Sequence, residues 1–442
     1  MKKYIKGISK GIILFIILII IFFTMLTISY SLPNYKIREN VKDSLIVLEN
    51  EQGFYYRPFF GSDNKLADSV TMDNYTDSII LSTALDLGEN KGENILKRVV
   101  SNYRYDDGEI GPIESLEKAV INEEEINTEY TRYWFGIEAF LRPMLIFFNY
   151  QTIRYINVFV IFGLFFAAIY KIAKKIGIKY AVAFGVSIML IGFIIVPMSL
   201  QYMPVASIML ISVIAIISLY DKKYFSKILP YIFICIGAIT AFMDLLTYPI
   251  ITLGIPLIIV MLLKMKYEKI TLKECIIIFL KMSIIWAVSY GMTYFVKWVI
   301  SSIILNKNVI TDAINQFLFR ADASGNNETN KIEVIGKNFS IYFNNIVLTM
   351  LVVYLIIYAL NLIKHIDKTK SKKCIIPLAL ISILPYVWYI VLSNHSDIHS
   401  WMAYKIQAVT LFGILSTTLI YINDESYKNK KIDKEKRQVR EK

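Results

Sequence analysis

The chain has 442 residues, of which 55% are hydrophobic and only 19% are charged. A soluble globular domain is about a quarter charged, so this composition excludes an ordinary soluble protein. The net charge of +12 does not indicate nucleic-acid binding, because the basic residues lie in short runs between hydrophobic stretches and at both ends. The composition predicts an all-α polytopic membrane protein.

Hydrophobic stretches recur along the whole chain, and most approach the roughly 20 residues that a helix needs to cross the hydrocarbon core. The first stretch is rich in Ile and lacks a small-residue cleavage site, so we expect a retained anchor rather than a signal peptide. About ten transmembrane helices are expected, at residues 11–32, 151–171, 180–198, 205–220, 228–248, 250–264, 275–300, 342–363, 375–393 and 406–422.

The charges between these stretches predict the orientation. Basic residues mark alternate connections, at Lys171 to Lys179, Lys222 to Lys227, Lys264 to Lys273 and Lys364 to Lys373. Because basic loops face the cytoplasm, both termini are expected there, in a multi-pass protein of a bacterial cell membrane. The chain then divides into an anchor (1–32), a large extracytoplasmic loop (33–150), a helical bundle (151–422) and a basic cytoplasmic tail (423–442).

The extracytoplasmic loop is expected to carry surface helices. One starts at Asp73 or Asn74, either of which can cap it, and runs to Leu87. A second starts at Asn122, three residues before a glutamate, and continues as an amphipathic helix until Pro143 kinks or ends it. Such a helix would lie along the membrane surface. Another short surface helix is expected within Thr311 to Arg320.

Two carboxylates four residues apart, Asp73 and Asp77, are the first candidates for chemistry. A carboxylate near the low-dielectric boundary acts as a general base when it lies within hydrogen-bond reach of an acceptor hydroxyl. The alternative is that Asp73 caps a helix and Asp77 is solvated in its first turn, where the helix dipole favours it.

The last outer loop contains His395, His399 and Lys405, which together can bind an anionic head group. Its aromatic residues also fit an interfacial loop without a site. The two histidines with Asp397 give only a weak metal signal, so a divalent cation remains possible but no cofactor is expected.

Three further polar residues are candidates for substrate binding. Arg132 and Arg142 fall on the expected amphipathic helix, where an arginine either clamps a phosphate or extends to lipid head groups. Asp244 lies at the outer end of a hydrophobic stretch, where an ionisable residue is a functional candidate, although Pro249 also fits a solvated turn.

This layout resembles the GT-C superfamily of membrane glycosyltransferases, which use polyprenyl-phosphate-linked sugars. The resemblance rests on the topology and on Asp73-Asn-Tyr-Thr-Asp77, Tyr130-Thr-Arg-Tyr-Trp134, Leu141-Arg-Pro143, Asp244-Leu-Leu-Thr-Tyr-Pro249 and the His395/His399 loop. It implies that Asp73 or Asp77 is the catalytic carboxylate. It also implies that basic residues of outer loops hold the donor phosphate, here Arg132, Arg142, His395, His399 and Lys405.

The chain departs from the family pattern in two ways. Asp73 lies about forty residues beyond Leu32, whereas the family's carboxylate follows its first helix closely, so the loop must fold back. The second acidic position of the family has no clear match, which leaves Asp244 or Asp312.

The expected reaction is transfer of a sugar to an envelope glycan or lipid on the outer face of the bilayer. A lipid-linked oligosaccharide polymerase and a flippase or transporter are the alternatives. A polymerase should have more than one arginine-rich outer loop, and a carrier should have ionisable groups near the bilayer midplane.

Overall fold

The computed structural model describes residues 2–56, 69–322, 329–365 and 375–421, which are helical apart from one two-stranded sheet and the connecting loops. Five helices in these ranges are long and apolar enough to cross a membrane. They are α1 (Lys2–Tyr30), α8 (Tyr150–Lys175), α11 (Phe225–Met243), α12 (Ile250–Tyr267) and α13 (Leu272–Leu305). Helices of this length and composition are typical of a membrane-embedded, multi-pass protein.

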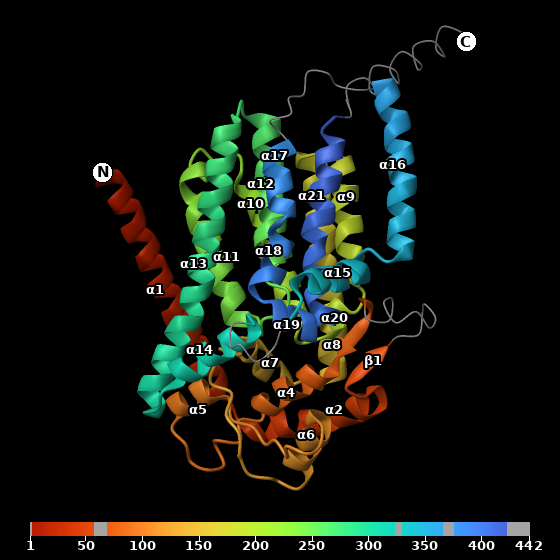
Figure 1. Ribbon diagram of the computed structural model, residues 1–442. Helices are drawn as coiled ribbons and strands as arrows, with labels where there is room; N and C mark the ends of the chain where they lie inside the picture. Colours follow the sequence, from red (N-terminus) through yellow and green to blue (C-terminus); the bar gives the residue numbers. More distant parts are fainter. Residues whose placement is uncertain (1, 57–68, 323–328, 366–374, 422–442) are drawn as a thin grey trace, which may run out of the picture.

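Further apolar helices complete the bundle (Figure 1). The pair α15 (Lys331–Tyr342) and α16 (Asn345–His365) meets the same length and hydropathy criteria but is bent by 74°, and counting it as one span gives six. Shorter ones are α9 (Ile178–Met189), α10 (Met203–Leu219), α17 (Ile375–Ser382), α18 (Leu384–Val391) and α21 (Gln407–Leu419). The expected number of ten spans depends on these shorter helices and stays a prediction.

Helix α12 lies at the centre of the bundle. Every residue from Ile250 to Lys264 is buried, because α10, α11, α13 and α21 pack around it. Gly254 permits the closest approach, since a Cβ atom there would lie 2.4 Å from a methyl carbon of Val409 on α21. Continuous burial explains why this segment reads as a nearly uninterrupted apolar run rather than an amphipathic one.

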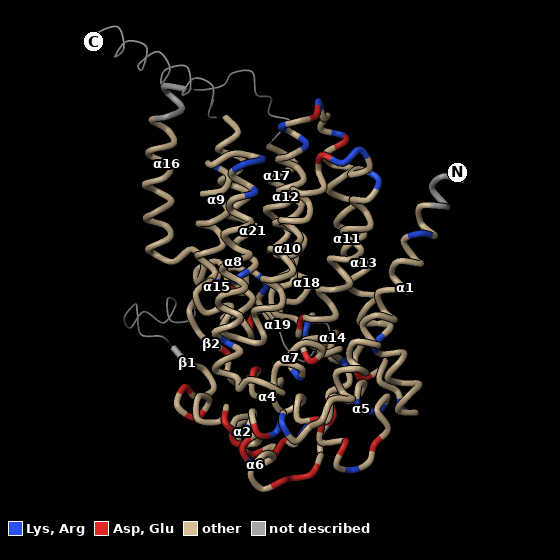
Figure 2. Tube along the Cα trace, turned by 180° about the vertical axis from the view of Figure 1, so that it is seen from behind, with Lys and Arg blue, Asp and Glu red and all other residues tan. Residues whose placement is uncertain are grey.

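Residues 34–56 and 69–150 fold into a cap over one end of the bundle, and Figure 2 shows most of the Asp and Glu residues there. The cap contains α2 (Asn34–Glu51), α4 (Asn74–Ala84), α5 (Ile95–Ser101), α6 (Pro112–Ile121), α7 (Glu138–Leu145) and an antiparallel pair of strands, β1 (Phe54–Tyr56) and β2 (Thr71–Asp73). Three later helices lie at the same end: α14 (Val309–Arg320), α19 (Ser393–Ile398) and α20 (Ser400–Ala403) (Figure 1).

Two of the expected helices are present, although most residues of α4 are buried rather than on a surface. Asp73 caps α4 by accepting a hydrogen bond from the Thr76 N–H at 2.9 Å, and α14 covers the stretch expected to be helical before Ala321. The predicted basic connection Lys364 to Lys373 lies mostly, and the predicted tail 423–442 entirely, outside the described residues.

The prediction of an amphipathic helix that starts at Asn122 is wrong. Asn122 instead ends α6, and Glu123 has a left-handed backbone conformation (φ 55°) that breaks the helix. The following residues, 123–137, run as an irregular segment up to α7, and tertiary backbone hydrogen bonds such as Tyr130 N–H to the Ser101 carbonyl hold them. Pro143 also lies inside α7 rather than ending it. Long-range contacts of residues 123–137 therefore outweigh the local sequence pattern that predicted a helix there.

Candidate functional site

Asp73 joins β2 to α4 and is buried, with 2% of its surface exposed. One carboxylate oxygen caps α4, and the other accepts a hydrogen bond from the indole N–H of Trp401 at 3.3 Å. Burial raises the pKa of Asp73 to about 6, although the hydrogen bond from Thr76 opposes that shift. A carboxylate with a pKa near neutrality is suited to accept and release a proton at physiological pH.

Asp77 lies one turn further along α4 and is fully buried, but its oxygens are occupied. They accept hydrogen bonds from the Tyr150 hydroxyl, the Ser199 hydroxyl at 3.1 Å, and the backbone N–H groups of Leu200 and Gln201 at 2.9 and 3.0 Å. Burial raises the pKa of this carboxyl as well, while these donors oppose the shift. Asp77 therefore joins α4 to the segment before α10, and Asp73 is the better candidate for a base.

His395 on α19 is buried and has both ring nitrogens engaged. Its Nδ1 lies 2.9 Å from a guanidinium nitrogen of Arg320, and its Nε2 lies 2.7 Å from the Leu246 carbonyl oxygen. An arginine only donates and a carbonyl only accepts, so the imidazole is neutral and carries its proton on Nε2. Burial and the charge of Arg320 hold the pKa of His395 well below its usual range, which agrees with this tautomer.

His399 and Trp401 connect this histidine to the carboxylate. The His399 ring lies 4.8 Å from the His395 ring and 5.2 Å from the Trp401 ring, between centroids. Burial lowers the pKa of His399 to about 4. Contacts thus run without a break through a set that we call the polar cluster: Asp73, Trp401, His399, His395 and Arg320.

Arg320 is a member that the sequence analysis placed on a surface helix but did not select. It is the last residue of α14, it is half-buried, and its guanidinium carbon lies 5.9 Å from the centroid of the Tyr133 ring. The feature of the sequence that could have identified Arg320 is its position at the end of a short amphipathic helix, where a long side chain can reach beyond the helix. Because His395 is neutral, Arg320 is the cation of the polar cluster.

Asp244 follows α11 and lies beside the polar cluster. One carboxylate oxygen accepts hydrogen bonds from the Thr247 N–H and hydroxyl at 2.9 and 2.6 Å, and the other has no partner among the described residues. Burial raises the pKa of Asp244 to about 6. Two residues later, the Leu246 carbonyl is the group that His395 contacts. Asp244 is therefore a further buried carboxyl beside the polar cluster, whereas Asp312 is exposed.

Lys405 approaches Asp73 from another side, through Tyr202. The buried ammonium donates to the Ile191 carbonyl at 2.9 Å and the Tyr404 hydroxyl at 3.0 Å, and it lies 4.8 Å from the centroid of the Tyr202 ring. Burial lowers the pKa of Lys405 to about 7. Burial raises the pKa of Tyr202 well above its usual range, and the charge of Asp73 adds to this rise.

The two arginines expected on one surface helix have different environments. Arg132 lies in the irregular segment and forms an ion pair with Asp312 at 2.9 Å, with 26% of its side chain exposed. Arg142 is fully buried, and its guanidinium donates to the carbonyls of Ser29 and Ala84 and to the Asn34 side chain. The expectation that Arg142 faces a phosphate at the membrane surface is therefore wrong, because its donors satisfy groups of the interior.

The histidine pair does not form the core of a metal site. The described residues contain no group of three or more His, Cys, Asp or Glu side chains placed to hold a metal ion. Asp397, which lies between the histidines in sequence, is exposed and pairs with Lys337 at 2.9 Å. Both nitrogens of His395 already have partners, so this ring offers no free ligand atom.

Comparisons with protein-family models, curated proteins and solved structures give no match to this chain. The resemblance to GT-C glycosyltransferases stays a prediction, and the argument for function rests on the polar cluster.

Proposed function

We propose that the chain is a membrane glycosyltransferase that moves a sugar from a polyprenyl-phosphate-linked donor to a cell-envelope glycan or lipid. The observation that carries the proposal is the polar cluster. It links a buried carboxylate with a raised pKa to a guanidinium through a continuous series of side-chain contacts from three distant segments, at one end of a bundle of apolar helices.

In the proposed reaction, the Asp73 carboxylate removes the proton from an acceptor hydroxyl as the oxygen attacks the anomeric carbon. The bond between that carbon and the phosphate oxygen breaks, and polyprenyl phosphate leaves with the bonding electrons. Arg320 stabilises the charge on the leaving phosphate, so that a general acid is not required. A single displacement of this kind inverts the configuration at the anomeric carbon.

The residues of the polar cluster differ in charge, and we assign their roles accordingly. His395 and His399 are neutral at pH 7, so they donate or accept hydrogen bonds rather than supply positive charge. Arg320 is half-buried, and its planar guanidinium suits bidentate contact with a phosphate. With the orientation expected from the basic loops, the cap and this reaction would lie on the outer face of the membrane.

The test uses the purified full-length chain in liposomes with radiolabelled polyprenyl-phosphate hexoses and an envelope lipid extract. We expect label to move to the extract as unlabelled polyprenyl phosphate accumulates, and Arg320→Ala to slow this transfer. Lys307→Ala is the matched control, because it removes an exposed cation next to the start of α14 that lies outside the polar cluster. Movement of intact donor across the bilayer without loss of its sugar would contradict the proposal and favour a carrier.

The pH dependence of transfer should follow the ionisation of Asp73. The base acts as a carboxylate, so the rate is expected to be constant above its pKa of about 6 and to fall as the pH falls below it. Protonation stabilises the folded form of a carboxyl whose pKa is raised by burial, so unfolding driven by Asp73 cannot cause this loss.

The measurement is kcat/KM for the donor between about pH 5 and pH 8, together with the melting temperature at each pH. Asp244 also has a pKa of about 6, so it could cause the same change of rate with pH. If Asp73 is the base, the Asp244→Asn protein should still show the fall in rate near pH 6. A rate that is flat across the range, or an inflection that disappears in Asp244→Asn, would show that Asp73 is not the base.

A further inference from the structure

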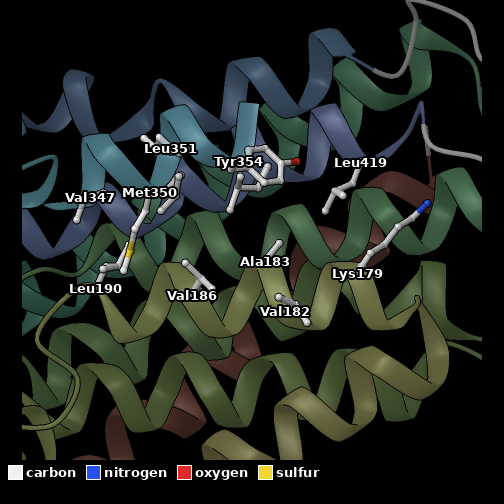
Figure 3. Close-up of a pocket in the computed structure, with 12 residues that line it drawn as sticks. Lys179, Val182, Ala183, Val186, Leu190, Val347, Met350, Leu351, Tyr354 and Leu419 are labelled. Carbon is white, nitrogen blue, oxygen red and sulfur yellow. The ribbon is translucent and has the colours of Figure 1, made fainter. Parts of the chain in front are cut away.

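An apolar groove separates α16 from α9 and α21, within the bundle and away from the polar cluster (Figure 3). It has a volume of about 420 Å³, which lies within the range of small-molecule binding sites, about 300–1,000 Å³. Apolar side chains form nearly all of its walls, with Ala183 and Val186 from α9 opposite Met350 and Leu351 from α16. Among the described residues that line it, Lys179 is the one that is charged.

The groove exists because α16 stands away from the bundle. The bend of 74° after α15 directs α16 outward, and its described contacts with α21 include a hydrogen bond between the Tyr354 and Thr418 hydroxyls at 2.7 Å. Apolar residues of α16 are exposed on its other sides, such as Val352 and Leu355, which are 56% and 50% exposed. In a membrane-embedded chain, such a surface faces hydrocarbon.

We propose that this groove binds a membrane phospholipid with an anionic head group, with one hydrocarbon chain between α9, α16 and α21 and the phosphate at Lys179. The side chain of Lys179 extends from one end of the groove, as Figure 3 shows. It closes a basic run that includes Lys171, Lys174 and Lys175, and such runs attract anionic lipids at a membrane surface. The apolar walls suit the hydrocarbon chain of this lipid, and the cation at one end of the groove suits its phosphate.

The proposed lipid is distinct from the sugar donor. Lys179 lies in the first turn of α9, whereas Ile191, whose carbonyl binds Lys405, follows the last turn. The rise of the helix separates these two ends by about 15 Å, so the lipid phosphate lies at the end of the bundle opposite the polar cluster. The inference therefore stands whether or not the chain transfers sugars.

The test uses the full-length chain in phosphatidylcholine nanodiscs that contain a trace of phosphatidylglycerol with a diazirine in its acyl chain. We expect photolabel on peptides of α9 and α16 that line the groove, with unlabelled phosphatidylglycerol competing for it. Ala183→Trp fills the groove and should reduce this labelling to background. Lys179→Gln should raise about fivefold the concentration of unlabelled phosphatidylglycerol that halves the labelling, because one lysine near a charged surface contributes an effect of this size.

Two matched variants serve as controls. Val160→Trp enlarges an exposed apolar residue of α8 outside the groove, and Lys273→Gln removes an exposed lysine of α13 that lies outside both the groove and its basic run; both should label like the parent. If Ala183→Trp does not fold, Val186→Trp makes the same change from the next turn of α9. Labelling that survives in the filled groove, or that ignores Lys179, overturns the proposal. Stronger competition by polyprenyl phosphate than by phosphatidylglycerol also overturns it, because the groove would then hold the donor chain.

Discussion

Replacing Asp73 with asparagine is expected to lower the rate of sugar transfer by about 10²–10⁴-fold, the usual contribution of a general base. The fold should be retained, because the asparagine carbonyl can still accept the hydrogen bond from the Thr76 N–H, and asparagine caps helices as well as aspartate does. The substitution thus removes the proton acceptor and leaves the cap.

The measurement is the single-turnover rate of donor consumption, with donor binding measured separately. Asp397→Asn is the matched control, since it neutralises an exposed carboxylate in the loop that carries the histidines. We expect Asp397→Asn to transfer at the parent rate and Asp73→Asn to bind donor with unchanged affinity. A folded Asp73→Asn protein with the parent rate would exclude Asp73 as the base.

Replacing Arg142 with alanine is expected to destabilise the chain by about 3–5 kcal/mol, the usual cost of removing one partner from a buried charge network. The guanidinium satisfies two backbone carbonyls and lies 3.9 Å from Asp86, which is also buried. Without it, Arg98, at 2.5 Å, is the cation that still pairs with Asp86. The pKa of Asp86, which burial already raises to about 7, should rise further.

The readout is the fraction of protein that stays monodisperse in detergent as the temperature is raised. Arg132→Ala is the comparison, because exposed ion pairs contribute at most about 1 kcal/mol. The expected order is a large loss for Arg142→Ala and almost none for Arg132→Ala. A stable Arg142→Ala protein with impaired donor binding would instead restore the phosphate-binding role that the sequence indicated.

The sequence predicted those features that depend on neighbouring residues. The long hydrophobic stretches became helices because any backbone in an apolar environment must satisfy its own hydrogen bonds. Asp73 was one of two residues expected to cap this helix, because capping involves only the next three residues. Asp77 was open to two interpretations, because its donors on residues 199–201 lie more than 120 positions away.

The membership of the site was less predictable. Arg142 and Arg320 both come from short helices with apolar faces, and nothing local indicates which one is interior. Arg142 is buried because the end of α1 and the end of α4 both direct carbonyls toward it. The aromatic residues of the last outer loop also fit an interfacial loop without a site, but Trp401 contacts Asp73 because β2 folds back next to α20.

The hydrogen bonds of Asp77 have a mechanical consequence. They fix α4 to the backbone just before α10, so Asp73, one turn away on α4, cannot move independently of α10. Any tilt of α10 would therefore move Asp73 with it. The distance from Asp73 to a bound acceptor hydroxyl would then depend on the tilt of α10.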